Sequence, residues 1–153
     1  MKIPKSDLEL IDFIIINSDY TFKQPHEKEK TNIRNLFAEY DIEIDFGDTE
    51  PAEEEDNIFN VFIKVEINRC ENPLPGYSIF CEGVGLFKIP NLKRLDEQTA
   101  NNLLKISPLS IIINNMRSYI MNITNYYPFG KYVLPSIDLK SVINSKIKQQ
   151  ENS

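Results

Sequence analysis

The chain has little of what catalytic and metal-binding sites are usually built from. Its 153 residues include one histidine, two cysteines, five glycines and no tryptophan. The histidine, His26, stands in a run of lysine and glutamate with no cysteine or second histidine at ligand spacing, so a zinc site or a Ser-His-Asp arrangement lacks partners. The glycines form neither a Gly-x-Gly-x-x-Gly nor a Gly-Lys-Ser/Thr motif. We therefore expect no metal, no cofactor and no enzymatic activity.

Basic stripes and long apolar runs are also absent. Six of the 23 acidic residues lie between Asp48 and Asp56, and outside that run 17 acidic residues balance the 17 basic ones. Proteins that bind nucleic acid normally carry a basic stripe or patch. No apolar run approaches the ~18 residues of a membrane-spanning helix, and the N-terminus lacks the order of a signal peptide. The sequence predicts a cytoplasmic protein that binds no nucleic acid and does not insert into a membrane.

The two cysteines, Cys70 and Cys81, are too few for a disulfide framework. They do not stand opposite one another in the hairpin described below. Free cysteine is among the residue types most often buried. We expect both to be buried thiols.

The clearest pattern that is present is a long amphipathic helix followed by a shorter one. Ser107 suits the N-cap and Pro108 the first helical position, where the missing N–H would be unpaired in any case. Pro128 and Gly130 end this helix, and the second begins at about Asp138. Apolar residues recur at steps of three and four on one face of each helix. They are Leu109, Ile112, Ile113, Met116, Ile120 and Ile123 in the first, and Leu139, Val142, Ile143 and Ile147 in the second.

Four segments before these helices have strand patterns. Residues 8–17 are continuously apolar and β-branched, which is typical of a strand covered on both faces. Residues 40–46 and 57–70 alternate between apolar and polar, as in strands with one solvated face. A turn rich in proline and glycine joins the third strand to a fourth over residues 77–89. With 41% apolar residues the chain can bury a substantial core, so we expect a single domain over residues 1–153.

Gly83 and Gly85 interrupt the fourth predicted strand. Glycine inside a strand indicates a bulge, a bend or the close approach of another backbone. We favour this structural interpretation over a ligand contact.

The order and spacing of these features resemble the SecB family of bacterial export chaperones over roughly residues 8–147. The matching positions are Gly85 with Phe87, Pro108, Met116-Arg117-Ser118-Tyr119, Tyr127-Pro128, Leu134-Pro135 and Ile137-Asp138-Leu139. The resemblance implies an α+β fold in which a four-stranded antiparallel sheet precedes a long helix and a shorter C-terminal helix. It also implies a homotetramer built as a dimer of dimers, with Cys81, Gly83 and Gly85 at a subunit interface.

The same resemblance implies an ATP-independent holdase that binds unfolded preproteins for export through the Sec translocase. In such proteins the connection between the first two strands, here residues 23–39, forms one wall of an apolar groove for clients. The corresponding residues are Phe22, Leu36, Phe37 and Tyr40. Ile33, Leu36, Phe37 and Tyr40 follow a helical step, which fits a short amphipathic helix. That spacing suits a groove and a plug of the core equally, so both interpretations stay open for Leu36 and Phe37.

Family members also dock to the translocation ATPase SecA through acidic residues on the sheet and through the C-terminal tail. Asp19 and Glu82 stand at such positions, and Glu82 shares its face with Ser78 and Phe80. The next expected acid falls on Lys23, and the tail has no acidic extension. These departures favour, as an alternative, a SecB-like chaperone dedicated to one partner, such as the antitoxin of a toxin–antitoxin operon. A scaffold subunit with the same fold and no client is a further alternative.

Overall fold

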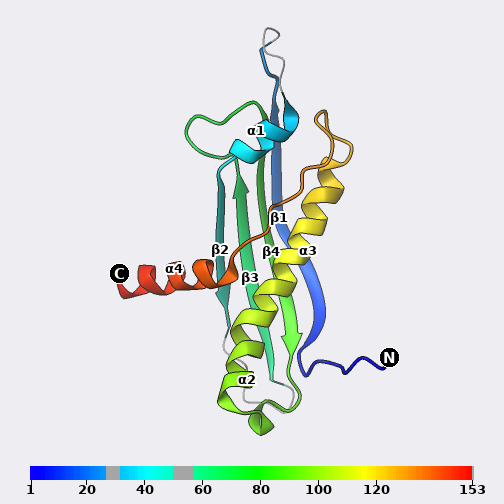
Figure 1. The fold of residues 1–153 in the computed structure, drawn as a ribbon, viewed down its shortest axis with the longest axis vertical. Helices are drawn as coiled ribbons and strands as arrows, with labels where there is room; N and C mark the ends of the chain where they lie inside the picture. The colour runs from blue at the N-terminus through cyan, green and yellow to red at the C-terminus, as the bar shows by residue number, and fades with distance from the viewer. Residues whose placement is uncertain (27–31, 50–56, 153) are drawn as a thin grey trace.

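A long helix lies across one face of a four-stranded antiparallel sheet in the computed structural model (Figure 1). The structure describes residues 1–26, 32–49 and 57–152. The strand order is β1-β4-β3-β2, so β1 and β2 form the two edges. The strands are β1 (Glu9–Lys23), β2 (Ile42–Asp48), β3 (Ile58–Ile67) and β4 (Gly76–Lys88). The predicted α+β class with a four-stranded antiparallel sheet is confirmed.

The helices surround this sheet at its two ends and on one face. Between β1 and β2 lies α1 (Ile33–Glu39), the short amphipathic helix predicted for the crossover. After β4 come a 3-10 turn and a helical stretch, and α4 follows as the last element. Their bounds are Leu92–Arg94 for the turn, Glu97–Asn101 for α2, Asn102–Ile106 for a π-helical turn, Ser107–Thr124 for α3 and Leu139–Glu151 for α4. None of the helices in these described parts is long and apolar enough to cross a membrane.

The long helix α3 continues an unbroken helical stretch that begins at Glu97, ten residues before the predicted N-cap. Asp96 is the cap: its carboxylate accepts hydrogen bonds from Thr99 N at 2.9 Å and from the Thr99 hydroxyl at 2.6 Å. The prediction of an N-cap at Ser107 is wrong, because that residue has helical φ and ψ of −63° and −44°. Pro108 therefore lies inside the helical stretch, two residues after the end of the π-helical turn. The wider turn fits the missing N–H and bulky ring of the proline.

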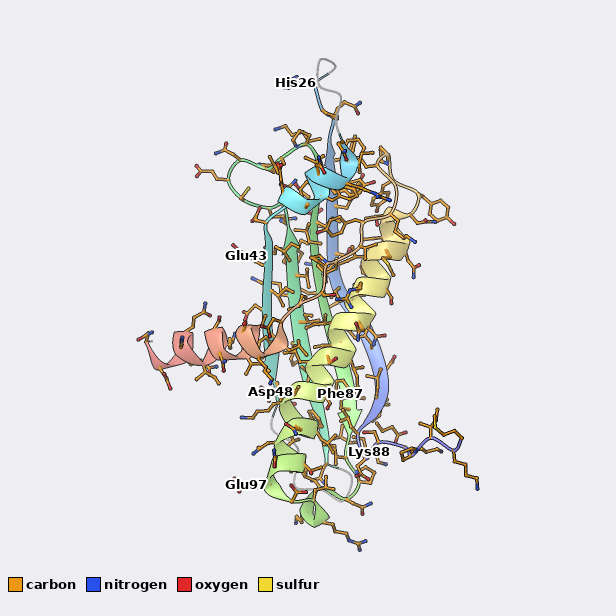
Figure 2. The ribbon with its side chains drawn as sticks, viewed as in Figure 1. His26, Glu43, Asp48, Phe87, Lys88 and Glu97 are labelled. Carbon is orange, nitrogen blue, oxygen red and sulfur yellow. The ribbon has the colours of Figure 1, made fainter. Side chains whose placement is uncertain are left out.

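The core lies between α3 and the facing side of β3 and β4. Alternate residues of both strands are buried, and Leu109, Ile112, Met116 and Ile120 of α3 are fully buried against them. Figure 2 labels one of the facing side chains, Phe87. The predicted stripe is confirmed except at its end, where Ile123 is half-buried. The residue buried there is Thr124, whose hydroxyl donates to Ile120 O at 2.7 Å.

Two glycines of β4 allow side chains to lie directly on the sheet. A Cβ at Gly85 would stand 2.6 Å from Ile112 Cγ2, and one at Gly83 would stand 2.8 Å from the Phe13 ring. The structural interpretation of these glycines is therefore correct, although the close neighbours are side chains of α3 and β1. Because these two glycines have no side chain, α3 can pack close to β4.

The sheet face opposite α3, called the open face below, carries exposed apolar residues. Ile14, Val84 and Phe62 form one row across β1, β4 and β3. The prediction that β1 is covered on both faces is wrong, because Ile14 is 53% exposed and Ile16 is 58% exposed. As an edge strand, β1 pairs with β4 only, so its outer edge and open face lack a neighbour within the described chain.

The turn between β3 and β4 also differs from its prediction. β3 ends at Ile67, three residues before the predicted end, because Asn68 adopts a positive φ of 52°. The Asn68 amide nitrogen donates to Leu74 O at 2.9 Å and to Tyr77 O at 2.7 Å, which closes the turn. Cys70 thus lies in the turn and is exposed, whereas Cys81 is buried as expected.

Candidate functional site

The segment between α3 and α4, residues 125–138, is held against α3 by hydrogen bonds. The Arg117 guanidinium donates from Nε to Leu134 O at 2.8 Å and from Nη2 to Pro135 O at 3.1 Å. Thr124 Oγ1 accepts a hydrogen bond from Tyr132 N at 2.9 Å. These bonds satisfy backbone groups of an otherwise irregular segment. They fix the point from which α4 starts.

The helix α4 itself is held lightly. Asp138 caps it by accepting hydrogen bonds from Lys140 N at 3.1 Å and Ser141 N at 3.3 Å, but none of its residues is buried. Lys146 ties α4 to β2 by an ion pair with Asp45, and its ammonium lies 5.8 Å from the centre of the Phe46 ring. The hydrogen bond from Lys146 lowers the pKa of the Asp45 carboxyl. In Figure 1, α4 projects outward beyond β2.

One groove runs along β2 beneath α4, and we call it the β2 groove. It has a volume of about 440 Å³. Its apolar lining consists of Ile42, Ile44, Phe46, Pro135, Ile137 and Val142. Since β2 is an edge strand that pairs with β3, its other edge offers backbone N–H and C=O groups beside this lining. An apolar groove next to a strand edge suits an extended polypeptide.

A second groove lies on the other side of α4, and we call it the lysine groove. It consists of two adjoining hollows of about 330 and 280 Å³, which share Lys105 and Ile143. Leu104, Leu109 and Ile147 line the first hollow, together with Asp48 at the end of β2. Figure 2 shows Asp48 below α4, on the side of that helix toward α2. The two grooves thus flank α4.

The four residues predicted for the client groove lie together in an aromatic cluster near α1. The Phe37 ring lies 5.5 Å from that of Tyr40 and 5.6 Å from that of Tyr77, which in turn lies 6.0 Å from Phe22. Leu36 is half-buried against the core beside them. Tyr40 is only 5% exposed, so it presents little surface to a client. Client binding by Phe22, Leu36 and Phe37 stays a prediction.

The cluster is tied together by tyrosine hydroxyls. That of Tyr40 donates to Pro75 O at 2.8 Å and accepts from Tyr77 N at 2.9 Å. That of Tyr77 donates to Gly130 O at 2.8 Å and accepts from Phe129 N at 2.8 Å. Burial raises the pKa of Tyr77 to about 12. These bonds join α1, the β3–β4 turn and the segment after α3, which indicates a structural role.

The linings of the β2 groove and of the predicted client groove share no residue. The alternation over residues 40–46 puts Ile42, Ile44 and Phe46 on one side of a strand, and helical spacing puts Val142 on the apolar face of the last helix, but neither pattern brings them together. Strand alternation gives the side on which a residue lies and not the element that faces it. No pattern in the sequence indicates that α4 starts beside β2, and this position is what creates the groove.

The predicted docking acids, Asp19 and Glu82, both lie on the open face. Asp19 forms a 2.8 Å ion pair with Arg69, and Glu82 stands opposite Lys64 of β3. Glu43 and Glu66 form a further cross-strand pair on this face. Figure 2 shows Glu43 at the outer edge of β2. The face is rich in acidic residues, and its role in docking stays a prediction.

Cys81, Gly83 and Gly85 face α3 within the chain. Cys81 is fully buried, its sulfur lies 3.8 Å from the Ser18 hydroxyl, and burial raises the pKa of its thiol. Side chains of α3 and β1 cover the two glycines. Their assignment to a subunit interface stays a prediction.

No protein-family model matches the chain, and no curated protein matches its sequence. Among solved structures it is similar to the Mycobacterium tuberculosis SecB-like chaperone Rv1957, in complex with a ChAD peptide from the Rv1956 HigA1 antitoxin. The TM-score is 0.59 with 16% sequence identity, over 86% of this chain and 90% of that one. A Streptococcus agalactiae protein of unknown function has a TM-score of 0.44 and 8% identity, over 84% and 97% of the two chains. The likeness to Rv1957 shows that this chain has a SecB-like fold.

Proposed function

We propose that this protein is a SecB-like chaperone of the cytoplasm, an ATP-independent holdase that binds unfolded polypeptides. The observation that carries the proposal is the β2 groove, in which apolar side chains lie beside a strand edge that pairs with no second strand among the described residues, under a lightly held helix. The SecB-like fold supports it, since the similar protein Rv1957 is itself a SecB-like chaperone in complex with a peptide.

The mechanism is passive capture of extended segments. The outer edge of β2 supplies backbone hydrogen bonds that do not depend on the client sequence. Every second client side chain then points toward Ile42, Ile44 and Phe46, because side chains alternate along a strand. An exposed ion pair contributes about 0–1 kcal/mol, so Lys146 and Asp45 hold α4 without preventing it from adjusting to a client.

Assembly increases the strength of capture. In the proposed homotetramer, a long client reaches several grooves, and each contact after the first is intramolecular. Modest sites on one oligomer thus hold an unfolded chain tightly without recognising a particular motif. In the export version of the proposal, the acidic open face, with Asp19 and Glu82, docks to SecA.

A chaperone dedicated to one antitoxin is the second candidate. It is favoured by the complex of Rv1957 with an antitoxin peptide. Both candidates use the same groove and differ in the range of clients.

Suppression of aggregation tests the proposal. The purified full-length protein, without nucleotide, should keep several unrelated unfolded proteins from aggregating at near-stoichiometric ratios, measured by light scattering. Replacing Val142 by serine removes an apolar side chain of the β2 groove and should weaken protection several-fold. The matched control is Val133→Ser, since Val133 is 50% exposed and does not line that groove. The control should protect as the wild type does.

The range of clients separates the candidates. Protection of unrelated clients supports the general holdase, and protection of one cognate antitoxin supports the dedicated chaperone. A folded protein that protects neither would overturn the chaperone proposal and favour a scaffold subunit.

A further inference from the structure

In the smaller hollow of the lysine groove, the charged side chains among the described residues are both positive. In the smaller hollow, Lys105 comes from the π-helical turn and Lys140 from the first turn of α4. The remaining polar side chains there are the amides of Asn101, Asn102 and Asn144, and none of the described residues that line this hollow is a carboxylate. All five side chains can donate hydrogen bonds, which is what a carboxylate requires.

Within the described residues, no carboxylate forms a salt bridge with Lys105 or Lys140. Lys146, which lines the larger hollow, is by contrast paired with Asp45. Lys140 also stands where a helix disfavours positive charge, because the N-terminus of a helix carries a partial positive charge. Asp138, the exposed N-cap of α4, offsets part of this cost by its electrostatic attraction to Lys140. An anionic group in the hollow would offset it further.

Apolar surface accompanies these lysines. Ile106 is 39% exposed and Ile143 lines both hollows, and Ile147, next along α4, is 47% exposed. A small anion would leave this apolar surface exposed to water. A polypeptide with an apolar residue beside an acidic one could contact both the apolar surface and the lysines. The open face carries Glu43, Glu66 and Glu82 against Lys64, so its net negative charge there would repel the same segment.

We propose that the lysine groove binds client segments in which aspartate or glutamate stands next to apolar residues. This inference rests on the proposed chaperone function and names the class of segment that this groove selects. The apolar part lies over Ile106, Ile143 and Ile147, and the carboxylates lie beside Lys105 and Lys140. The two grooves then bind different segments of a client. The β2 groove binds apolar segments by backbone pairing, and the lysine groove binds segments that also carry a carboxylate.

Three labelled peptides test the preference by fluorescence anisotropy on the full-length protein. They share the same apolar residues and carry glutamate, glutamine or lysine between them. The glutamate peptide should bind about fivefold tighter than the glutamine peptide, as expected for a pair of exposed ion pairs, and the lysine peptide should bind weakest. The difference should shrink as salt is raised from 0.05 M to 0.5 M.

Charge reversal locates the effect. The double variant Lys105→Glu with Lys140→Glu should reverse the order of the three peptides, and Lys105→Gln with Lys140→Gln should remove it. The matched control is Lys93→Glu with Lys148→Glu, which makes the same change at exposed lysines that line neither hollow. The control should keep the wild-type order, and circular dichroism checks that each variant is folded.

The outcomes separate the two proposals. Equal binding of the three peptides, or an equal effect of the control pair, overturns the carboxylate preference while the chaperone function stands. Full displacement of the glutamate peptide by an equal concentration of inorganic phosphate overturns it as well, because the hollow would then be a simple anion site. Failure of all three peptides to bind, with no protection against aggregation, overturns the chaperone function itself.

Discussion

Three tyrosines of the aromatic cluster near α1, Tyr40, Tyr77 and Tyr132, differ in the hydrogen bonds that their hydroxyls form. Those of Tyr40 and Tyr77 each donate one hydrogen bond and accept one. Tyr132 is 2% exposed, and its hydroxyl is buried with no partner among the described residues. Burial raises its pKa to about 12, since a charged phenolate would be still harder to bury. The same chemical group therefore stabilises the fold at two positions and not at the third.

Removing each hydroxyl should show this difference. Tyr40→Phe leaves the buried N–H of Tyr77 without its acceptor, and Tyr77→Phe does the same to the part-buried N–H of Phe129. Each should lower the free energy of unfolding by about 1–3 kcal/mol. Tyr132→Phe removes a buried polar group that has no partner, and should leave the stability unchanged or raise it slightly. Urea unfolding monitored by circular dichroism measures all three. A loss for Tyr132→Phe as large as for the other two would mean that its hydroxyl has a partner, such as an ordered water.

At the scale of elements, the packing of α3 on β4 depends on residues without side chains. Gly85 lies directly under Ile112, and Gly83 lies under Phe13 and Met116. Gly47 in β2 has no atom within 4 Å of the position where a Cβ would stand. The sheet thus offers two kinds of glycine, one required by packing and one not.

Alanine at these positions tests the packing. Gly85→Ala should destabilise the protein by about 1–3 kcal/mol, because the new methyl group overlaps Ile112 and the core has no room to move. Gly47→Ala is the matched control and should be neutral or stabilising by up to about 1 kcal/mol, since glycine weakens a strand interior. Thermal melts give both values. Equal melting temperatures for the two variants would show that α3 does not press on β4 as the structure places it.

The helical stretch from α2 to α3 also has a consequence for the site. The π-helical turn before Pro108 carries Leu104 and Lys105, which line the lysine groove. A π-helical turn changes the angular position of the residues that it contains relative to a regular helix. The proline that breaks the regular hydrogen bonding therefore helps to direct residues of the groove.

For the whole molecule, the exposed apolar surface of one chain favours association. Ile11, Ile14 and Ile16 of β1 are 46%, 53% and 58% exposed, and Phe62 on the open face is 41% exposed. Among the described residues, the 15-residue strand β1 pairs only with β4, so no strand lies along its outer edge. Exposed apolar patches and free strand edges are typical of interaction surfaces.

We expect a homotetramer, built as a dimer of dimers, with β1 at one of its interfaces. Light scattering coupled to size-exclusion chromatography should give a mass about four times the 17.8 kDa of one chain. Ile14→Lys with Ile16→Lys should reduce the mass, because charges disfavour pairing along β1, whereas Val133→Lys should not. A monodisperse species with the mass of one chain at micromolar concentration would contradict the oligomer and the avidity that depends on it.

The amino-acid sequence by itself determined the elements whose signals are local. The stripe from Leu109 to Ile120, the start of the last helix at Asp138, the helix in the crossover and the four strands all follow from side-chain period and capping chemistry. These signals are carried by residues a few positions apart, so they hold whatever the rest of the chain does.

The tertiary structure decided what covers each element. The continuous apolar run of β1 indicated burial on both faces, yet its isoleucines are exposed at a sheet edge. Pro108 fitted the start of a helix, yet the helix is capped at Asp96 and passes through the proline. The grooves arise where α4 starts beside β2. The segment before α4 is held in this position by the hydrogen bond from Arg117, in the middle of α3, to Leu134 O. Such contacts join residues far apart in the chain, and a local pattern states which side of an element is apolar but not what lies against it.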